Sequence, residues 1–208
     1  MTTLMTFEQV MLELAVPHGT VEGWDKRRSW GVTAAALIDL ETADRVNLTA
    51  AGKDLYVTRV NSDSTGVAPL DQVLHDLTDS SKLRDILKRQ GDTIEHEAAA
   101  SMKGLISVQR RSFLGLFPKR YRIHDAAAKS AVDAQLAETL RGGRADPQAL
   151  AVIAILDGLR VLNQVLPEAG RWRKQHDIEQ PGTESAVFRT LRNEVGHIGT
   201  FIPGFGAS

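Results

Sequence analysis

The spacing of apolar residues along the chain predicts a mainly helical protein. In most segments, apolar side chains recur every three or four residues, the period that places them on one face of an α-helix. Helices are expected at residues 7–15, 29–42, 69–77, 83–90, 92–102, 126–140, 149–165 and, near the C-terminus, 184–195. The segment 149–165 is the most apolar of these, and we expect it to be the central helix.

Two stretches change to the shorter period of β-strands and predict two hairpins. Their strands are expected near residues 46–48 and 55–60, and near 105–108 and 121–123. A helix followed by a hairpin thus occurs twice, at 29–60 and at 92–124. This order is also typical of winged-helix proteins, so a nucleic-acid-binding protein is one alternative.

Composition and length favour one cytoplasmic domain. The 208 residues are 42% hydrophobic and 25% charged, with no cysteine, which excludes disulfides and thiolate chemistry. We expect a single domain over 1–208 with a loose, glycine-rich tail from about residue 199. The start of the chain has no signal-peptide pattern. Its longest apolar run is far shorter than the roughly 20 residues that cross a bilayer, so we expect no membrane span.

The distribution of charge says more than the net charge of −1. Between Gly104 and His124 there are five basic residues and no acidic residue: Arg110, Arg111, Lys119, Arg120 and Arg122. A second basic cluster is formed by Lys26, Arg27 and Arg28. If the fold gathers these on one face, a near-neutral protein still has a basic side.

The sequence contains no common catalytic signature. It has no GxSxG, no Walker A loop, no GxGxxG and no HExxH, and its six histidines have no metal-ligand spacing. We therefore expect a protein that is not an enzyme and that has neither a cofactor nor a metal. An enzyme acting on a soluble phosphorylated substrate is the weakest of the alternatives.

The segment from Trp24 to Gly31 places two indoles and three cations just before an expected helix start. A helix N-terminus favours an anion such as phosphate, and indoles suit a membrane interface. The alternative is that Trp30 packs in the core while the basic run is a solvated loop.

The tip of the second hairpin is unusually apolar. Phe113, Leu114, Leu116 and Phe117 surround Gly115, between flanking arginines. Such a tip is costly in water and usually covers something. It could enter a membrane interface helped by the cations, dock on a second subunit, or fold back onto its own core.

Five segments in order resemble the Golgi phosphoprotein 3 family. They are a tryptophan upstream of a helix that ends in Ala36–Leu40, a strand like Asp44–Leu48, a helix like Pro69–Leu74, a turn like Lys103–Ile106, and an apolar helix like Leu150–Val165. The resemblance implies a central hydrophobic helical bundle wrapped by amphipathic helices, with a projecting β-hairpin. It also implies a peripheral membrane protein that binds phosphatidylinositol 4-phosphate, carries protein cargo and forms homo-oligomers.

Only some residues of the family's lipid pocket are present at the corresponding positions of this sequence. Its tryptophan falls on Trp24, but Thr33 stands where the family has an arginine, and two further arginines fall near Gln90 and Thr93. The expected head-group residues are Trp24, Lys26, Arg27, Arg28, Thr33, Lys88 and Arg89. The residues expected for membrane insertion or oligomerisation are Arg110, Arg111, Phe113, Leu114, Leu116, Phe117, Lys119 and Arg120.

The sequence therefore favours a cytoplasmic, peripherally membrane-associated binding or adaptor protein that recognises anionic lipid head groups. Two alternatives remain open: a winged-helix-like nucleic-acid-binding regulator and a cytosolic protein-binding scaffold. Nucleic acid is disfavoured, because the expected recognition helix at 29–42 carries no Arg, Lys, Asn or Gln after Trp30 to read bases.

Overall fold

A computed structural model gives the architecture of the chain and describes residues 4–16, 23–110, 119–142, 146–167 and 186–199. The helices are α1 (Thr6–Leu14), α2 (Trp24–Thr42), α3 (Ala68–Asp76), α4 (Leu83–Ser101), α5 (Ala126–Leu140), α6 (Pro147–Gly158), α7 (Leu162–Val165) and α9 (Ala186–Gly199). The strands are β1 (Val46–Ala51), β2 (Asp54–Arg59), β3 (Ser80–Lys82), β4 (Ile106–Arg110) and β5 (Arg120–Ile123). The expected mainly helical fold with small antiparallel hairpins is confirmed. The predicted tail from about residue 199 lies almost entirely outside the described residues.

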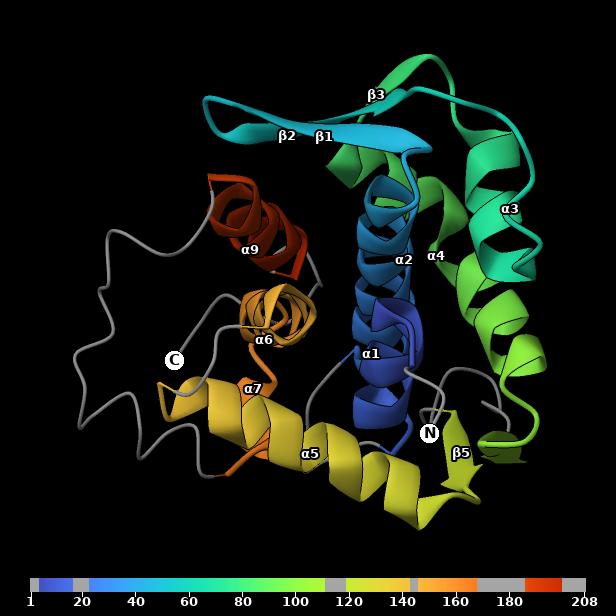
Figure 1. Ribbon diagram of the computed structural model, residues 1–208, viewed down its shortest axis with the longest axis vertical. Coiled ribbons are helices and arrows are strands. Elements are labelled where there is room, and N and C mark those ends of the chain that lie inside the picture. The colour runs from blue at the N-terminus through green and yellow to red at the C-terminus, as the bar shows by residue number, and fades with distance from the viewer. Residues whose placement is uncertain (1–3, 17–22, 111–118, 143–145, 168–185, 200–208) are drawn as a thin grey trace.

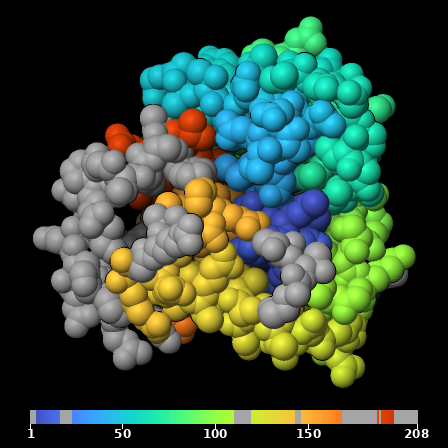
Figure 2. All heavy atoms as spheres, viewed as in Figure 1, coloured from blue at the N-terminus to red at the C-terminus, as the bar shows by residue number. Residues whose placement is uncertain are grey.

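Helix α2 occupies the middle of the molecule, with α1 beside it (Figure 1). Helices α3 and α4 lie on one side of α2, and α6 and α9 lie on the other. The sheet crosses one end of this arrangement, and α5 crosses the opposite end. In the space-filling view, α5 forms the lower edge of the visible face (Figure 2). None of the helices in the described ranges is long and apolar enough to cross a membrane.

Small residues allow α2 to pack closely on several sides. Ala34, Ala35 and Ala36 are fully buried, which agrees with the close approach that this triplet predicts. A Cβ on Gly31 would lie 2.9 Å from a methyl group of Leu159, so only glycine fits there without movement. Because every residue from 31 to 38 is buried, α2 presents no free face over this stretch.

Helix α4 is continuous, whereas the sequence predicted two helices separated near Gly91. Gly91 is buried against α2, where a Cβ would lie 3.2 Å from the Cβ of Ser29. The glycine therefore serves close helix packing and does not end a helix. A mid-helix glycine costs less than about 1 kcal/mol, which this packing offsets.

The apolar helix predicted for 149–165 is broken into α6 and α7. Arg160 has a positive φ of 58°, a backbone conformation that interrupts a right-handed helix. Next to it, the Leu159 carbonyl accepts a hydrogen bond from the guanidinium of Arg27. At the end of α6, Gly158 lies so close to α9 that a Cβ would meet the Arg192 carbonyl oxygen at 2.6 Å.

The first sheet has three strands in the order β1-β2-β3, all antiparallel, where the sequence predicted a two-stranded hairpin. The added strand β3 was missed because only three residues, Ser80–Lys82, pair with β2 and none of them is apolar. The second hairpin agrees with its prediction: β4 pairs with β5, with Ile106 opposite Ile123 and Val108 opposite Tyr121.

Candidate functional site

The basic cluster after Trp24 lies in the first turn of α2, and not in a loop before a helix at Ser29. Gly23 precedes the helix with a φ of 69°, which glycine adopts at little cost. Trp24 is only 2% exposed, and its indole N–H donates to the Leu14 carbonyl oxygen at 3.0 Å. Trp24 therefore packs in the core, while Trp30 is only partly buried. The alternative considered from the sequence placed Trp30 in the core, whereas the structure places there Trp24, which was expected to contact a lipid head group.

Arg28 makes several contacts with other groups of the protein. Its side chain is completely buried and donates to Glu95 at 3.0 Å and to Asp25 at 2.6 Å. It also donates to the carbonyl oxygens of Leu14 and Lys119, at 3.3 and 3.2 Å. Because all these partners belong to the protein, Arg28 is a structural cation in this conformation.

Glu95 on α4 is the acidic partner and is equally buried. Burial alone would raise the pKa of this carboxyl, but the charge of Arg28 and a hydrogen bond from Ser29 act against it and hold the pKa below its ordinary range. Tyr121 on β5 donates its hydroxyl to Glu95 at 2.8 Å, and its ring lies 4.9 Å from the Arg28 guanidinium. Burial and the neighbouring Glu95 raise the pKa of Tyr121.

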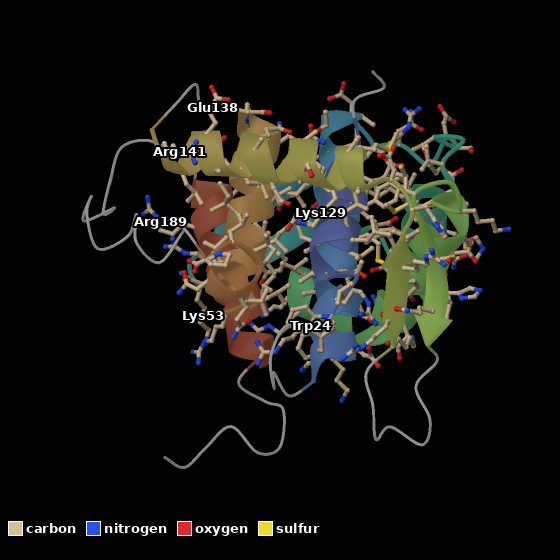
Figure 3. The ribbon with its side chains drawn as sticks, turned by 90° about the horizontal axis from the view of Figure 1, so that it is seen from below. Trp24, Lys53, Lys129, Glu138, Arg141 and Arg189 are labelled. Atoms are coloured by element: carbon tan, nitrogen blue, oxygen red, sulfur yellow. The ribbon has the colours of Figure 1, made fainter. Side chains whose placement is uncertain are left out.

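These contacts fix the start of strand β5, next to the segment that connects it to β4, to the helices. Asp25 accepts two hydrogen bonds from the Lys119 backbone N–H, at 2.9 and 3.1 Å, and the Tyr121 N–H donates to the Ala15 carbonyl at 3.0 Å. Figure 3 shows Trp24 near one end of α2. The ends of β4 and β5 that residues 111–118 connect in the sequence lie on the same side of the molecule. We call the group Asp25, Arg28, Glu95, Lys119 and Tyr121 the hairpin latch.

The remaining expected head-group residues are split between the interior and the surface. Arg27 is buried, and Thr33 is also buried, with its hydroxyl donating to the Ser29 carbonyl at 2.8 Å. Lys26 is exposed beside them. Lys88 and Arg89 are exposed on α4, where they line a separate open cavity whose lining does not include Trp24. The structure thus does not bring the seven predicted residues together.

The hairpin residues divide in a similar way. Lys119 is partly buried, with its ammonium 3.6 Å from Glu95, whereas Arg120 is exposed. Arg122 is exposed on the same face of β5, and Val108 on β4 is 51% exposed. The side chain of Arg110 is not described. Arg111, Phe113, Leu114, Leu116 and Phe117 lie outside the described residues.

Sequence reasoning missed several residues of the cavity on α4. Tyr56, Ser81 and Lys82 line it together with Lys88 and Arg89. Lys82 was not among the expected site residues, because strand β3 was not predicted. The tripeptide Ser80-Ser81-Lys82, which stands directly before the helix at Leu83, was the available signal.

The geometry also bears on the other function classes. In a winged-helix protein, the helix before the hairpin enters a nucleic-acid groove, but α2 is buried on all sides between residues 31 and 38. The first helix–hairpin unit therefore cannot bind in that way. Within the described ranges, no three His, Asp or Glu side chains gather as metal ligands.

Fold and site together define a mainly helical protein that exposes basic side chains on a well-anchored hairpin. The family model of Golgi phosphoprotein 3 (GPP34) matches residues 7–196, which is nearly the whole chain. The chain therefore belongs to the Golgi phosphoprotein 3 family, as its sequence motifs predicted. A search among proteins of curated function finds no match.

Proposed function

We propose that this protein is a non-catalytic adaptor that binds the anionic face of a membrane from the cytoplasm. Family membership supports a binding role. The observation that carries the proposal is the exposure of Arg120 and Arg122 on the same strand whose other face is fixed by Tyr121. A strand held in this way presents its cations without the entropy cost of ordering a loop on binding.

The apolar hairpin tip is the second part of the proposal. Residues 113–117 come just before strand β5, which carries both cations, so electrostatic attraction and apolar insertion would act at one end of the hairpin. Each cation near an anionic leaflet contributes about 1 kcal/mol. Two cations and four large apolar side chains give a reversible attachment, which suits an adaptor that recruits protein cargo.

The first test is flotation with liposomes of phosphatidylcholine, with and without phosphatidylglycerol. We expect binding only to the anionic vesicles and weaker binding at higher salt. The variant Arg120→Gln with Arg122→Gln removes two exposed cations, which should lower the partition coefficient about 30-fold. Phe113→Ser with Phe117→Ser should also reduce binding.

The matched control is Lys53→Gln with Arg189→Gln, which removes two exposed cations on the side away from the hairpin (Figure 3). An equal loss in this control would mean that only the overall charge matters. No flotation with any vesicle would refute membrane binding and favour the cytosolic protein-binding scaffold.

A further inference from the structure

Strand β4 has one edge that no other described strand covers. Its partner β5 bonds on both sides, because Tyr121 donates its backbone N–H to the Ala15 carbonyl oxygen at 3.0 Å on the side away from β4. Backbone groups in an antiparallel pair point alternately toward and away from the partner strand. Val108 lies opposite Tyr121, so the N–H and C=O of Val108 point away from β5.

The unpaired part of this edge is short. It begins after the N–H of Ile106, which donates to the Met102 carbonyl oxygen at 2.9 Å. It ends near Gln109, where the register between the two strands is irregular. Between these limits, the C=O of Ile106 and the N–H and C=O of Val108 bond to no other backbone group in the described part of the chain. An added strand pairs with groups of this kind.

The other sheet covers its corresponding edge. On edge strand β1, the outward N–H of Leu48 donates to the Glu41 carboxylate at 3.1 Å. Proteins commonly cover or shorten such edges, because an exposed edge pairs with other chains. On β4, in contrast, the side chains of residues 107–109 are all exposed. The edge of β4 therefore has the features of a docking site for an extended chain.

The two faces of β4 differ in the side chains that an added strand would meet. Val108 is exposed on one face. On the opposite face, the small Ser107 lies beside Arg122 of β5, which is exposed. Neither strand carries an acidic residue. Two strand spacings amount to roughly 10 Å, which a long arginine and a glutamate span together.

We propose that the edge of β4 binds an extended peptide of a partner protein in which apolar and acidic residues alternate. The peptide adds an antiparallel strand, the more stable of the two pairings, and its backbone bonds to Ile106 and Val108. Its apolar side chains pack beside Val108, because residues directly opposite each other share a face. Its acidic side chains lie on the other face, toward Arg122. This binding needs no lipid, so it does not rest on the proposed membrane attachment.

The probe is the soluble peptide Glu-Val-Glu-Val-Glu-Val-Glu, blocked at both ends and labelled for fluorescence anisotropy. Two N-methylated forms separate strand addition from simple attraction of charge. In the proposed pairing the valine backbone groups face β4, so methylation of the valine nitrogens should weaken binding at least about tenfold. Methylation of the glutamate nitrogens should leave binding largely intact, because those N–H groups point to solvent.

Variants of the protein test the same contact from the other side. Val108→Pro removes the outward N–H, which takes no part in the pairing with β5, and edge strands tolerate proline at such positions. We expect it to weaken binding at least about tenfold. Val108→Thr keeps the N–H and the β-branched shape and is the matched control. The methylated peptides test the contact on the wild-type protein, whether or not Val108→Pro folds.

The contribution of charge has its own pair of variants. Arg122→Gln should weaken binding of the acidic peptide roughly threefold, because the pair it forms is partly screened by water. Lys53→Gln removes an exposed cation on the side away from the hairpin and should leave binding unchanged.

Hydrogen exchange of the Val108 amide gives the direct readout. Protection that appears with the peptide, but not with its valine-methylated form, supports the proposal. The proposal is overturned if the wild type does not bind the peptide, or if the two methylated forms bind equally. Protection that rises with protein concentration alone would show a second copy of the chain at this edge, and would also overturn the assignment to a partner peptide.

Discussion

At the residue scale, the interior of this protein contains a buried ion pair, Arg28 with Glu95, in addition to its apolar side chains. Both side chains have zero exposure and lie 3.0 Å apart. Burying two charges costs several kcal/mol per ion, and their attraction offsets this only with good geometry and further hydrogen bonds. Ser29, Tyr121 and Asp25 supply those further contacts.

Removing one partner of this pair should destabilise the fold strongly. Arg28→Met leaves the buried Glu95 without its main counter-charge, and we expect a loss of about 3–5 kcal/mol of unfolding free energy in urea denaturation. The double variant Arg28→Met with Glu95→Leu should lose less than the sum of the single variants, since no buried charge is then left unpaired.

The matched control is Asp79→Asn, which breaks the exposed pair of Arg59 and Asp79, also 3.0 Å apart. We expect this control to cost less than about 1 kcal/mol, because water screens an exposed pair. A loss as small as this for Arg28→Met would contradict the account of the latch.

The latch also shows where sequence reasoning stops. The sequence marked Trp24 and the basic run as special, and they do gather at one end of α2. It could not show that Arg28 points inward, because its partners Glu95 and Tyr121 lie 67 and 93 positions away along the chain. A buried arginine is exceptional unless it is paired, so composition alone favours the surface.

At the element scale, the regular spacing of apolar residues predicted several helices and strands correctly. Features that depend on contacts between elements were not predicted. The helix at 126–140 and the hairpin strands near 105–108 and 121–123 follow their apolar periods closely. The break between α6 and α7 depends on a positive φ at Arg160 and on a contact from Arg27, neither of which a periodic pattern contains. The continuity of α4 through Gly91 likewise depends on the helix packed against it.

Helix α5 is attached to α1 by a contact that depends on pH. Lys129, labelled on α5 in Figure 3, donates to the buried Glu13 carboxylate of α1 at 3.0 Å. Only Val132 and Leu136 of α5 are buried. Burial outweighs the attraction of Lys129 and raises the pKa of Glu13 from 4.5 to about 7.

The raised pKa predicts the direction of a pH effect on stability. Between the unfolded and folded values, from 4.5 to about 7, the folded state holds a proton that the unfolded chain has lost. Stability therefore falls as the pH rises through this window. Glu13→Gln should remove up to about 3 kcal/mol of this fall.

The measurement is the unfolding free energy by urea denaturation at pH 5, 6, 7 and 8. Glu138→Gln on the exposed side of α5 is the control and should follow the wild type. If the wild type and Glu13→Gln show the same dependence on pH, Glu13 does not titrate in this range.

At the scale of the whole molecule, we expect two copies of the protein to associate through the β4–β5 hairpin. The tip residues Phe113, Leu114, Leu116 and Phe117 combine large apolar area with little polar cover in the sequence. Two copies could bury their tips against each other in the absence of a membrane. The resemblance to the family, described from the sequence, also implies homo-oligomers.

We expect the average mass in multi-angle light scattering to rise with protein concentration. Phe113→Ser with Phe117→Ser should remain monomeric over the same range, because the apolar area to be buried is smaller. A monomeric wild type at every concentration would refute self-association through the hairpin. Detergent below its micellar concentration should act as the variant does.

The latch has a further consequence for how the chain reaches its fold. Its contacts join Leu14 and Ala15, the start of α2, the middle of α4 and strand β5, so no contiguous piece shorter than the segment from Leu14 to Tyr121 contains them all. Contacts between such distant positions cost loop-closure entropy before they return any stability, and they slow folding. The attachment of strand β5 to the helices is thus the non-local step of the folding reaction, whereas the helices and the β1–β2 turn need only local encounters.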